Sequence, residues 1–155
     1  PVYLRFGRPS VPNFTTNDIG FKIGEGILLR PGTDVTIVAT GHLVWEAIEA
    51  SVELKNYGVD SEVINIHTIK PLDEKIILKS VKKTGCIVSA EEHNYIGGLG
   101  ESISGLLATK YPTPMEFVAT QDTFGESGKP AELMAKYGLN KDAIIQKVLE
   151  LKKRL

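Results

Sequence analysis

The stretch Asp34-Val-Thr-Ile-Val-Ala39 is a short run of β-branched and apolar residues, typical of a strand that is buried on both faces. The turn residues Pro31 and Gly32 come just before it. After it, Ser61 to His67 predicts another strand. Between these two strands, apolar residues recur at helical spacing until Gly58, a usual helix stop: Leu43, Ala47, Ala50, Leu54 and Tyr57. Two strands joined by a helix predict a parallel pair with a crossover.

The same alternation continues outward in both directions. Phe21 to Leu29 predicts a strand before this unit. Beyond it we expect a helix capped by Asp73 and stopped by Gly85, a strand over Cys86 to Ala90, a helix after Gly98 with Leu99, Ile103, Leu106 and Leu107 inward, a strand over Met115 to Ala119, and helices from about Pro130 and Asn140, the last with an apolar face of Ile144, Val148, Leu151 and Leu155. The pattern predicts an α/β fold with helices on both faces of a mainly parallel sheet.

The first twenty residues follow a different pattern. Val2 to Phe6 predicts a short strand, after which Pro9 and Pro12 interrupt any regular element. We therefore expect residues 1–20 to be the end of a preceding domain plus a linker, and residues 21–155 to be the main domain. Because the chain begins with Pro1 and not Met, we also expect it to be a fragment of a longer chain.

Composition excludes several classes of protein. The chain has 155 residues, of which 42% are hydrophobic and 24% charged, which is ordinary for one globular domain. Eighteen basic and nineteen acidic residues leave a net charge of -1, so no basic field would attract nucleic acid. No apolar run approaches the length of a membrane span, and no signal peptide is visible. The single Cys86 cannot form an internal disulfide, and we expect a reducing, cytoplasmic location.

Known catalytic and cofactor motifs match poorly. Gly98-Leu99-Gly100 resembles a dinucleotide fingerprint, but its third position is Ile103, and the preceding Glu91 and Glu92 would repel a phosphate. A tight turn that allows close approach is the favoured interpretation. A Walker A loop and a nucleophile elbow are both absent. The three histidines have no second ligand at metal spacing, and Cys86 reads as a core residue.

The most unusual polar stretch is Glu91-Glu92-His93-Asn94-Tyr95, at the carboxyl end of a predicted parallel strand. It could form a catalytic pair or an interface network, and we favour the interface. Glycines after it would permit close approach of a partner backbone. The interface candidates are Glu91, Glu92, His93, Gly97, Gly98, Gly100 and Glu101. Near the start of the chain, Arg8 is either an anion ligand or a solvated arginine.

Five segments, in order along the chain, resemble transketolases. Lys-Pro-Leu-Asp and Gly-Lys-Pro-Ala-Glu-Leu favour that family over 1-deoxyxylulose-phosphate synthase and the beta subunits of 2-oxoacid dehydrogenases, whose C-terminal domains remain alternatives. A free-standing Rossmann-like nucleotide- or effector-binding module is the alternative from another class. The similar segments are Pro1 to Pro9, Asp34 to Gly41, His67 to Asp73, Glu91 to Glu101 and Gly125 to Leu133; the first resembles the end of the pyrimidine-binding domain and the others the C-terminal domain.

The resemblance implies a three-layer α/β/α domain with a five-stranded mixed, mainly parallel sheet whose first strand is antiparallel. It implies an enzyme of the pentose phosphate pathway that transfers a two-carbon ketol unit between sugar phosphates, using thiamine diphosphate and Mg or Ca. In the family these cofactors bind between two subunits, in the two domains that precede this one. The implied partners are therefore the N-terminal thiamine-binding domains or subunit, within a homodimer.

The resemblance also assigns roles within this chain. The family's Gly-Asp-Gly cofactor motif and its activating glutamate are absent, so we expect no catalytic residue, no cofactor, no metal and no activity in the isolated chain. Arg8 matches the arginine that holds the sugar phosphate, although its neighbours, Phe-Gly-Arg-Pro, differ from the commoner Ser-Arg context. The chain as a whole is expected to support dimer assembly and to complete the substrate channel.

Overall fold

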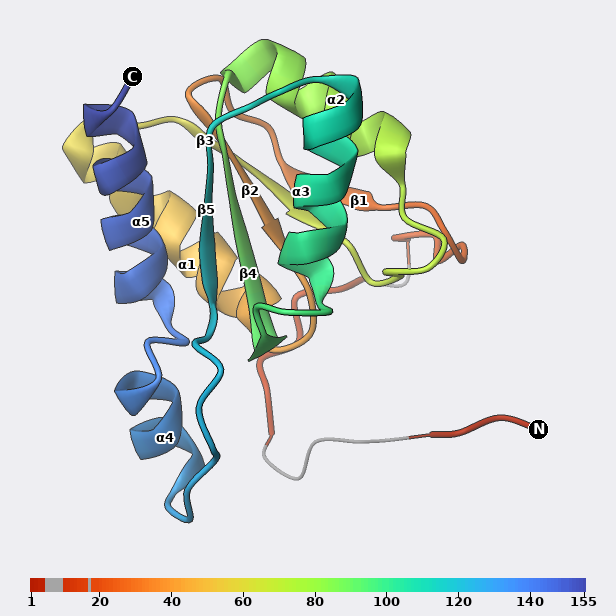
Figure 1. The fold of residues 1–155 in the computed structure, drawn as a ribbon, viewed down its shortest axis with the longest axis vertical. Helices are drawn as coiled ribbons and strands as arrows, with labels where there is room; N and C mark the ends of the chain where they lie inside the picture. Colours follow the sequence, from red (N-terminus) through yellow and green to blue (C-terminus); the bar gives the residue numbers. More distant parts are fainter. Residues whose placement is uncertain (5–9, 17) are drawn as a thin grey trace.

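The computed structural model describes residues 1–4, 10–16 and 18–155, and its centre is a five-stranded mixed sheet between two layers of helices (Figure 1). The strand order is β1-β3-β2-β4-β5. Strand β1 pairs antiparallel with β3, and all other pairs are parallel. This confirms the predicted fold class, including the antiparallel first strand. The strands are β1 (Ile27–Arg30), β2 (Val35–Ala39), β3 (Ser61–Asn65), β4 (Ile87–Asn94) and β5 (Met115–Thr120).

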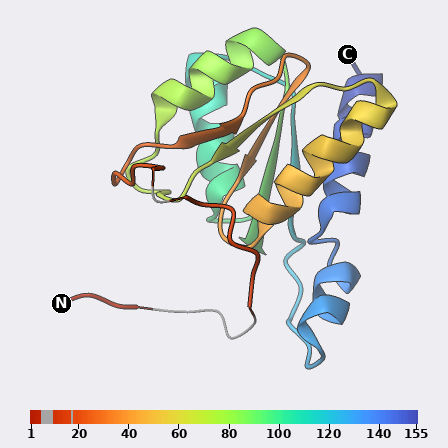
Figure 2. The ribbon, with the colours of Figure 1, turned by 180° about the vertical axis from the view of Figure 1, so that it is seen from behind.

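Helices cover both faces of the sheet (Figure 2). Helices α1 (Leu43–Leu54) and α5 (Lys141–Lys153) enclose the first core cluster, while α2 (Glu74–Thr84) and α3 (Leu99–Lys110) enclose the second. A 3-10 turn, η1 (Lys55–Tyr57), extends α1, and the short helix α4 (Pro130–Lys136) lies apart from the sheet. Because the chain's own elements complete both clusters, we expect it to fold as a unit.

Strand β2 is the centre of the core, as the opening motif predicts. All five of its residues are buried. Because side chains alternate along a strand, Val35, Ile37 and Ala39 face the first cluster, whereas Val38 faces the second. Helix ends also follow their predicted signals. Asp73 accepts a hydrogen bond from the backbone N–H of Ile76, and the stops after α1–η1 and α2 are glycines in the left-handed conformation.

The predicted strand Phe21 to Leu29 is wrong over its first six residues, 21–26. Strand β1 begins only at Ile27, and Phe21 and Ile23 are each 70% exposed. Gly24 has a φ of +83°, which interrupts extended structure. Gly26 lies so close to the body that a Cβ there would be 2.6 Å from the Cδ1 atom of Ile66. The chain therefore turns into the sheet at these glycines.

Four further predictions, on the bounds of strands and on the burial of one residue, differ from the structure. Strand β4 runs on to Asn94, because its polar residues continue the extended backbone, whereas β3 stops at Asn65. Leu155 is 64% exposed, because α5 ends before it. Residues 1–4 form no strand, and the rest of the predicted first strand lies outside the described residues.

No helix in the described part of the chain is long and apolar enough to cross a membrane.

Candidate functional site

The polar residues at the end of β4 lie at the carboxyl edge of the parallel strands, where open α/β sheets usually bind ligands or partners. Along this end of the strand burial changes within one step. Glu91 is 1% exposed, while Glu92 and His93 lie at the surface. The segment therefore divides into a buried carboxylate and an exposed polar rim.

The buried carboxylate of Glu91 caps helix α3. Its Oε2 atom accepts a hydrogen bond from the backbone N–H of Leu99 at 2.7 Å, and its Oε1 atom accepts one from Gly100 at 2.8 Å. Both donors belong to the first turn of the helix, whose N–H groups have no partner within the helix. A negative charge at this end also interacts favourably with the helix dipole. Glu91 thus occupies the place that a phosphate takes in dinucleotide-binding folds.

Two glycines of the turn make room for groups of this chain itself. A Cβ on Gly98 would lie 2.2 Å from the Oε2 atom of Glu91. A Cβ on Gly100 would lie 2.4 Å from the ring of Phe117 and 2.8 Å from the hydroxyl of Ser89. Internal packing therefore accounts for both glycines. Gly97 is different, because it is exposed and has a φ of +81° with open space around it.

The exposed rim is a network of polar contacts. Glu92 pairs with His42, whose Nδ1 atom lies 3.0 Å from the carboxylate. The Nδ1 atom of His93 lies 2.7 Å from the carbonyl oxygen of Asn94, and Asn94 donates to Asp122 at 2.9 Å. Glu101 accepts from the backbone N–H of Gly97. Among these described contacts no histidine faces a hydroxyl, thiol or amine nucleophile, so the arrangement suits polar recognition.

The sequence-predicted site residues are thus only partly brought together. Glu92, His93, Gly97 and Glu101 lie on one exposed edge, whereas Glu91, Gly98 and Gly100 are buried behind it. Their assignment to an interface between subunits stays a prediction. Arg8 lies outside the described residues, and its role stays a prediction as well.

A pocket of about 360 Å³ adjoins this rim. Glu92 and His93 line one part of it, and residues of the loop after β5 and of α4, among them Leu133, Met134 and Tyr137, line another. Sequence reasoning missed this loop as a site component. The sequence feature that could have indicated this loop is Phe124, an aromatic residue in the otherwise polar run between β5 and Pro130.

The residues of this edge do not fit a thiamine diphosphate site. The helix N–H groups that could hold a diphosphate already bind Glu91. Over residues 1–4, 10–16 and 18–155, no three His, Cys, Asp or Glu side chains group closely enough to hold a metal ion. We therefore assign no step of any reaction to this chain's residues through that cofactor.

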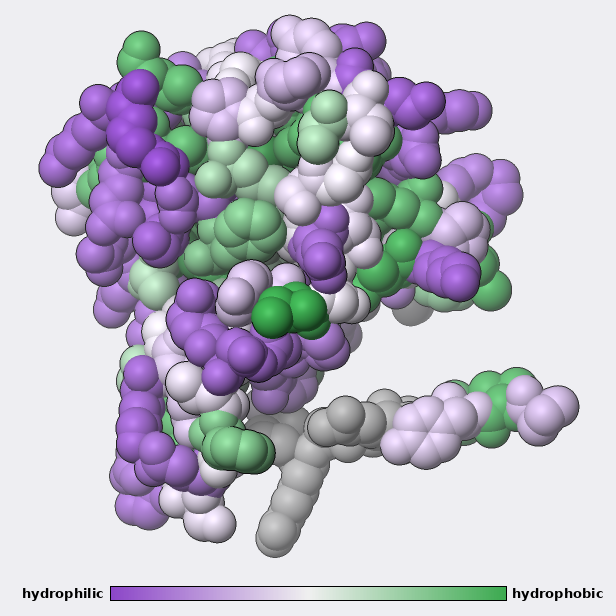
Figure 3. All heavy atoms as spheres, in the orientation of Figure 1, coloured by the Kyte–Doolittle hydropathy of each residue, from purple (hydrophilic) through white to green (hydrophobic). Residues whose placement is uncertain are grey.

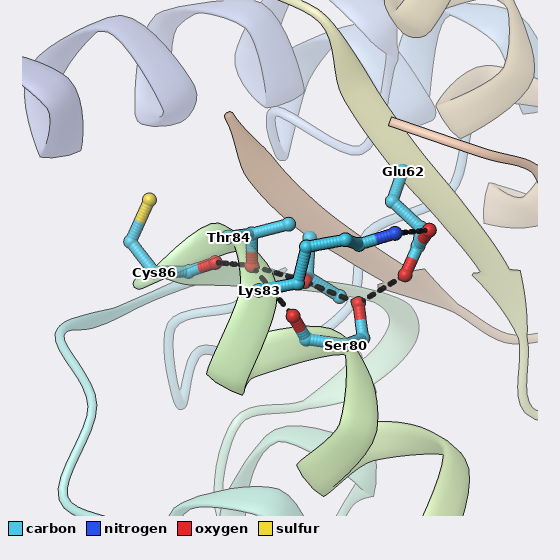
Figure 4. A network of polar contacts seen from close by, with 6 residues as sticks. Glu62, Ser80, Lys83, Thr84 and Cys86 are labelled. Carbon is cyan, nitrogen blue, oxygen red and sulfur yellow. Dashed lines mark hydrogen bonds and ion pairs between the residues drawn. The ribbon is translucent and has the colours of Figure 1, made fainter. Parts of the chain in front are cut away.

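The opposite end of the sheet holds a second polar network, with a structural role (Figure 4). The buried Glu62 on β3 accepts hydrogen bonds from Lys83 and from the hydroxyl of Ser80, at 2.6 Å for the latter. Thr36 lies 2.6 Å from Ser80 and 2.7 Å from Thr84. Burial acts to raise the pKa of Glu62, but the bonds from Lys83 and Ser80 outweigh it and hold this pKa below its ordinary value.

The cysteine beside this network is a core residue, as predicted. Cys86 is fully buried, and its thiol faces the carbonyl oxygen of Asp34 at 3.4 Å. Burial raises the pKa of this thiol, which disfavours the reactive thiolate.

Comparison with known proteins identifies the family. The profile of the family described as "Transketolase, C-terminal domain" matches residues 24–144. The chain belongs to this family. It is 43% identical over 155 residues to the 6-deoxy-6-sulfo-D-fructose transketolase subunit of Clostridium sp., and the match covers 99% of this chain and 48% of that protein.

Two further similarities are to a synthase and to a solved split-gene structure. The transketolase-family chain is 36% identical over 150 residues to the 1-deoxy-D-xylulose-5-phosphate synthase of Desulforudis audaxviator, covering 94% of this chain and 24% of the synthase. A solved structure described as "Split gene transketolase, inactive beta4 tetramer" matches with a TM-score of 0.90 and 39% identity, covering 94% of this chain and 48% of that one. The chain thus spans about half the length of the Clostridium subunit and of the solved chain.

Proposed function

We propose that this transketolase C-terminal domain is a non-catalytic part of a ketol-transferring enzyme. In that enzyme it would act with N-terminal thiamine-binding domains or a separate subunit, support a homodimer, and contribute Arg8 to the binding of sugar phosphates. The single observation that carries the proposal is the 43% identity to a transketolase subunit over 99% of this chain, matching only 48% of that subunit. Such a match is expected for one functional portion of a larger subunit.

The cofactors in this proposal, thiamine diphosphate with Mg or Ca, are held by residues outside the chain. The occupied amino end of α3 supports this assignment, because Glu91 excludes a diphosphate from the most suitable backbone site. The same occupation disfavours the alternative of a nucleotide-binding module. The pentose phosphate pathway and a cytoplasmic location are part of the proposal on the family resemblance alone.

Calorimetric titration tests whether the isolated chain itself binds the cofactor or a nucleotide. We expect no stoichiometric binding of thiamine diphosphate with Mg²⁺, and no binding of ATP or NAD at micromolar concentration. Stoichiometric binding of thiamine diphosphate would contradict the non-catalytic assignment. Binding of ATP or NAD would favour the nucleotide-binding alternative.

Hybrid enzymes test which reaction the domain supports. In a first hybrid, this chain replaces the matching part of the Clostridium subunit; in a second, it replaces the matching part of the Desulforudis synthase. We expect the first to transfer ketol units when supplied with any further subunit its parent requires, and the second to be much less active. The reverse result would favour a synthase-type parent. Inactivity of both hybrids, with their parents active, would contradict the proposal.

A further inference from the structure

Residues 121–137 form a lobe that stands out from the body of the domain. This α4 lobe consists of the loop after β5 and helix α4, and it projects below the sheet in Figure 1. The same projection is visible at the lower left of the space-filling view in Figure 3. Helix α4 has no buried residue, although Met134 and Tyr137 pack partly against the first core cluster. The lobe includes the Gly125 to Leu133 segment, for which neither the core nor the proposed chemistry provides a reason.

Three polar contacts hold the lobe, one of them to a backbone carbonyl group. Asn94 donates to Asp122, whose φ of 52° lies in the left-handed region. The hydroxyl of Tyr137 donates to the carbonyl oxygen of Phe124 at 3.2 Å. Farther along the loop, Lys136 holds both carboxylate oxygens of Glu126, at 2.6 and 2.7 Å. A loop held in this way loses little conformational entropy when a partner binds.

The side chain that this fastened loop displays is aromatic. The ring of Phe124 is 98% exposed although its own carbonyl group is hydrogen-bonded. Tyr95 and Ile96, at the neighbouring end of β4, are 40% and 50% exposed. Phe124 lies between Thr123 and Gly125, which line the same pocket as Glu92 and His93. An exposed aromatic side chain on a pre-organised loop beside such polar groups is typical of a binding surface with an aromatic anchor.

The path of the chain indicates what covers this surface. Phe14 packs partly against the first core cluster, and the described segment 10–16 leaves the body at the same end as the α4 lobe (Figures 1 and 2). The Clostridium subunit and the solved split-gene chain are each about twice as long as this chain. A domain connected through segment 10–16 would therefore lie against the carboxyl edge of the sheet.

We propose that the α4 lobe, with Phe124 as its anchor, docks onto the amino-terminal portion of the enzyme. This inference rests on the proposed function, and it names the surface that joins the two portions. The partner chemistry is an apolar pocket for the ring of Phe124, surrounded by polar groups that face the Glu92–His93 rim. Docking there places the polar rim of β4 in the contact between the two portions of the enzyme. The Glu62 end of the sheet lies outside that contact.

Hydrogen–deuterium exchange tests this proposal in the Clostridium hybrid subunit, which contains the full chain. The reference is the isolated chain at a concentration where sedimentation shows a monomer. In the hybrid we expect about tenfold slower exchange over residues 92–97 and 121–129, and little change around Lys83 to Cys86. The hybrid with Phe124→Ala should lose most of this protection. The matched control is Tyr57→Ala, which removes an aromatic residue that is 56% exposed beyond the far end of α1.

Three other kinds of result would overturn the docking proposal, and each would indicate a different explanation. Protection on another surface, or equal loss in both variants, would place the joint elsewhere and leave the proposed function intact. Protection of the α4 lobe in the isolated chain at high concentration, with dimer formation, would assign the surface to a second copy of this chain. No protection anywhere in the hybrid would count against the proposed function as well as the docking surface.

Discussion

The carboxylate of Glu91 lies 2.7 Å from the backbone nitrogen of Leu99, the first residue of helix α3. A side chain from the end of one strand thereby caps the helix that follows it. The turn between them carries a glycine pattern that otherwise indicates phosphate binding, so an internal anion here replaces an external one. This relationship links the stability of the domain to the occupation of the amino end of α3 by the chain's own carboxylate.

Glu91→Ala should therefore destabilise the domain strongly. It removes a buried acceptor from two N–H groups and leaves both without a partner, so we expect a loss of about 2–4 kcal/mol in the free energy of unfolding. Urea denaturation followed by circular dichroism measures it. Glu92→Ala is the control, because its surface pair with His42 should contribute less than about 1 kcal/mol. Equal losses of unfolding free energy in the two variants would show that the buried cap of α3 stabilises the domain no more than the surface pair does.

Replacing glycine by alanine should change the stability of the domain in opposite directions at two positions: Gly98, which precedes α3, and Gly105, which lies within it. Gly98→Ala places a Cβ 2.2 Å from the Glu91 carboxylate, and we expect it to cost about 1–3 kcal/mol. Gly105→Ala meets nothing within 4 Å in the helix interior, and it should stabilise by about 0.5–1 kcal/mol. Thermal unfolding measures both. In a Glu91→Ala background the cost of Gly98→Ala should shrink, and an unchanged cost would place the clash elsewhere.

The elements of the fold were predictable where local signals and tertiary packing agree. The buried run Val35 to Ala39 and the caps Asp73 and Gly85 are of this kind, because short-range chemistry determines them. Phe21 and Ile23 mislead because apolar residues alone do not make a strand when nearby glycines turn the chain. Their exposure became visible only in three dimensions.

The candidate site was predictable in location but not in the division of its roles. Glu91 and Glu92 are adjacent and chemically identical, yet one is a buried cap and the other is an exposed partner of His42. Strand alternation and the approach of α3 produce that difference, and neither can be read from residue type. Phe124 was overlooked for a related reason, since a lone aromatic residue in a loop carries no periodic signal.

The Glu62 network should make stability depend on acidity. Because the folded-state pKa of Glu62 is held below its ordinary value, its charge stabilises the fold at neutral pH. This contribution is present above the unfolded pKa, near 4.5, and is lost as pH falls through the folded value. We expect Glu62→Gln to cost about 1–3 kcal/mol at pH 7 and progressively less in acid.

Urea titrations at several pH values between about 7 and 3 measure this dependence, because this range extends to both sides of the unfolded pKa of 4.5. The control is Glu132→Gln, an exposed carboxylate on α4 that forms an i,i+3 pair with Lys129. A Glu62→Gln curve parallel to that of the wild type would mean that the carboxyl group does not stabilise the fold through its charge.

Arg8→Ala should weaken the use of phosphorylated donors in the Clostridium hybrid enzyme. A charge-assisted hydrogen bond to phosphate contributes about 1.5–3 kcal/mol, so we expect kcat/KM for a sugar phosphate to fall roughly 10- to 150-fold. An unphosphorylated donor, such as a small hydroxyketo acid, lacks the anion and should react at nearly the unchanged rate. Arg8→Lys should recover only part of the loss, because an ammonium group keeps the charge but not the planar fork. Arg5→Ala is the neighbouring control, and equal losses for both donors would make Arg8 a structural residue.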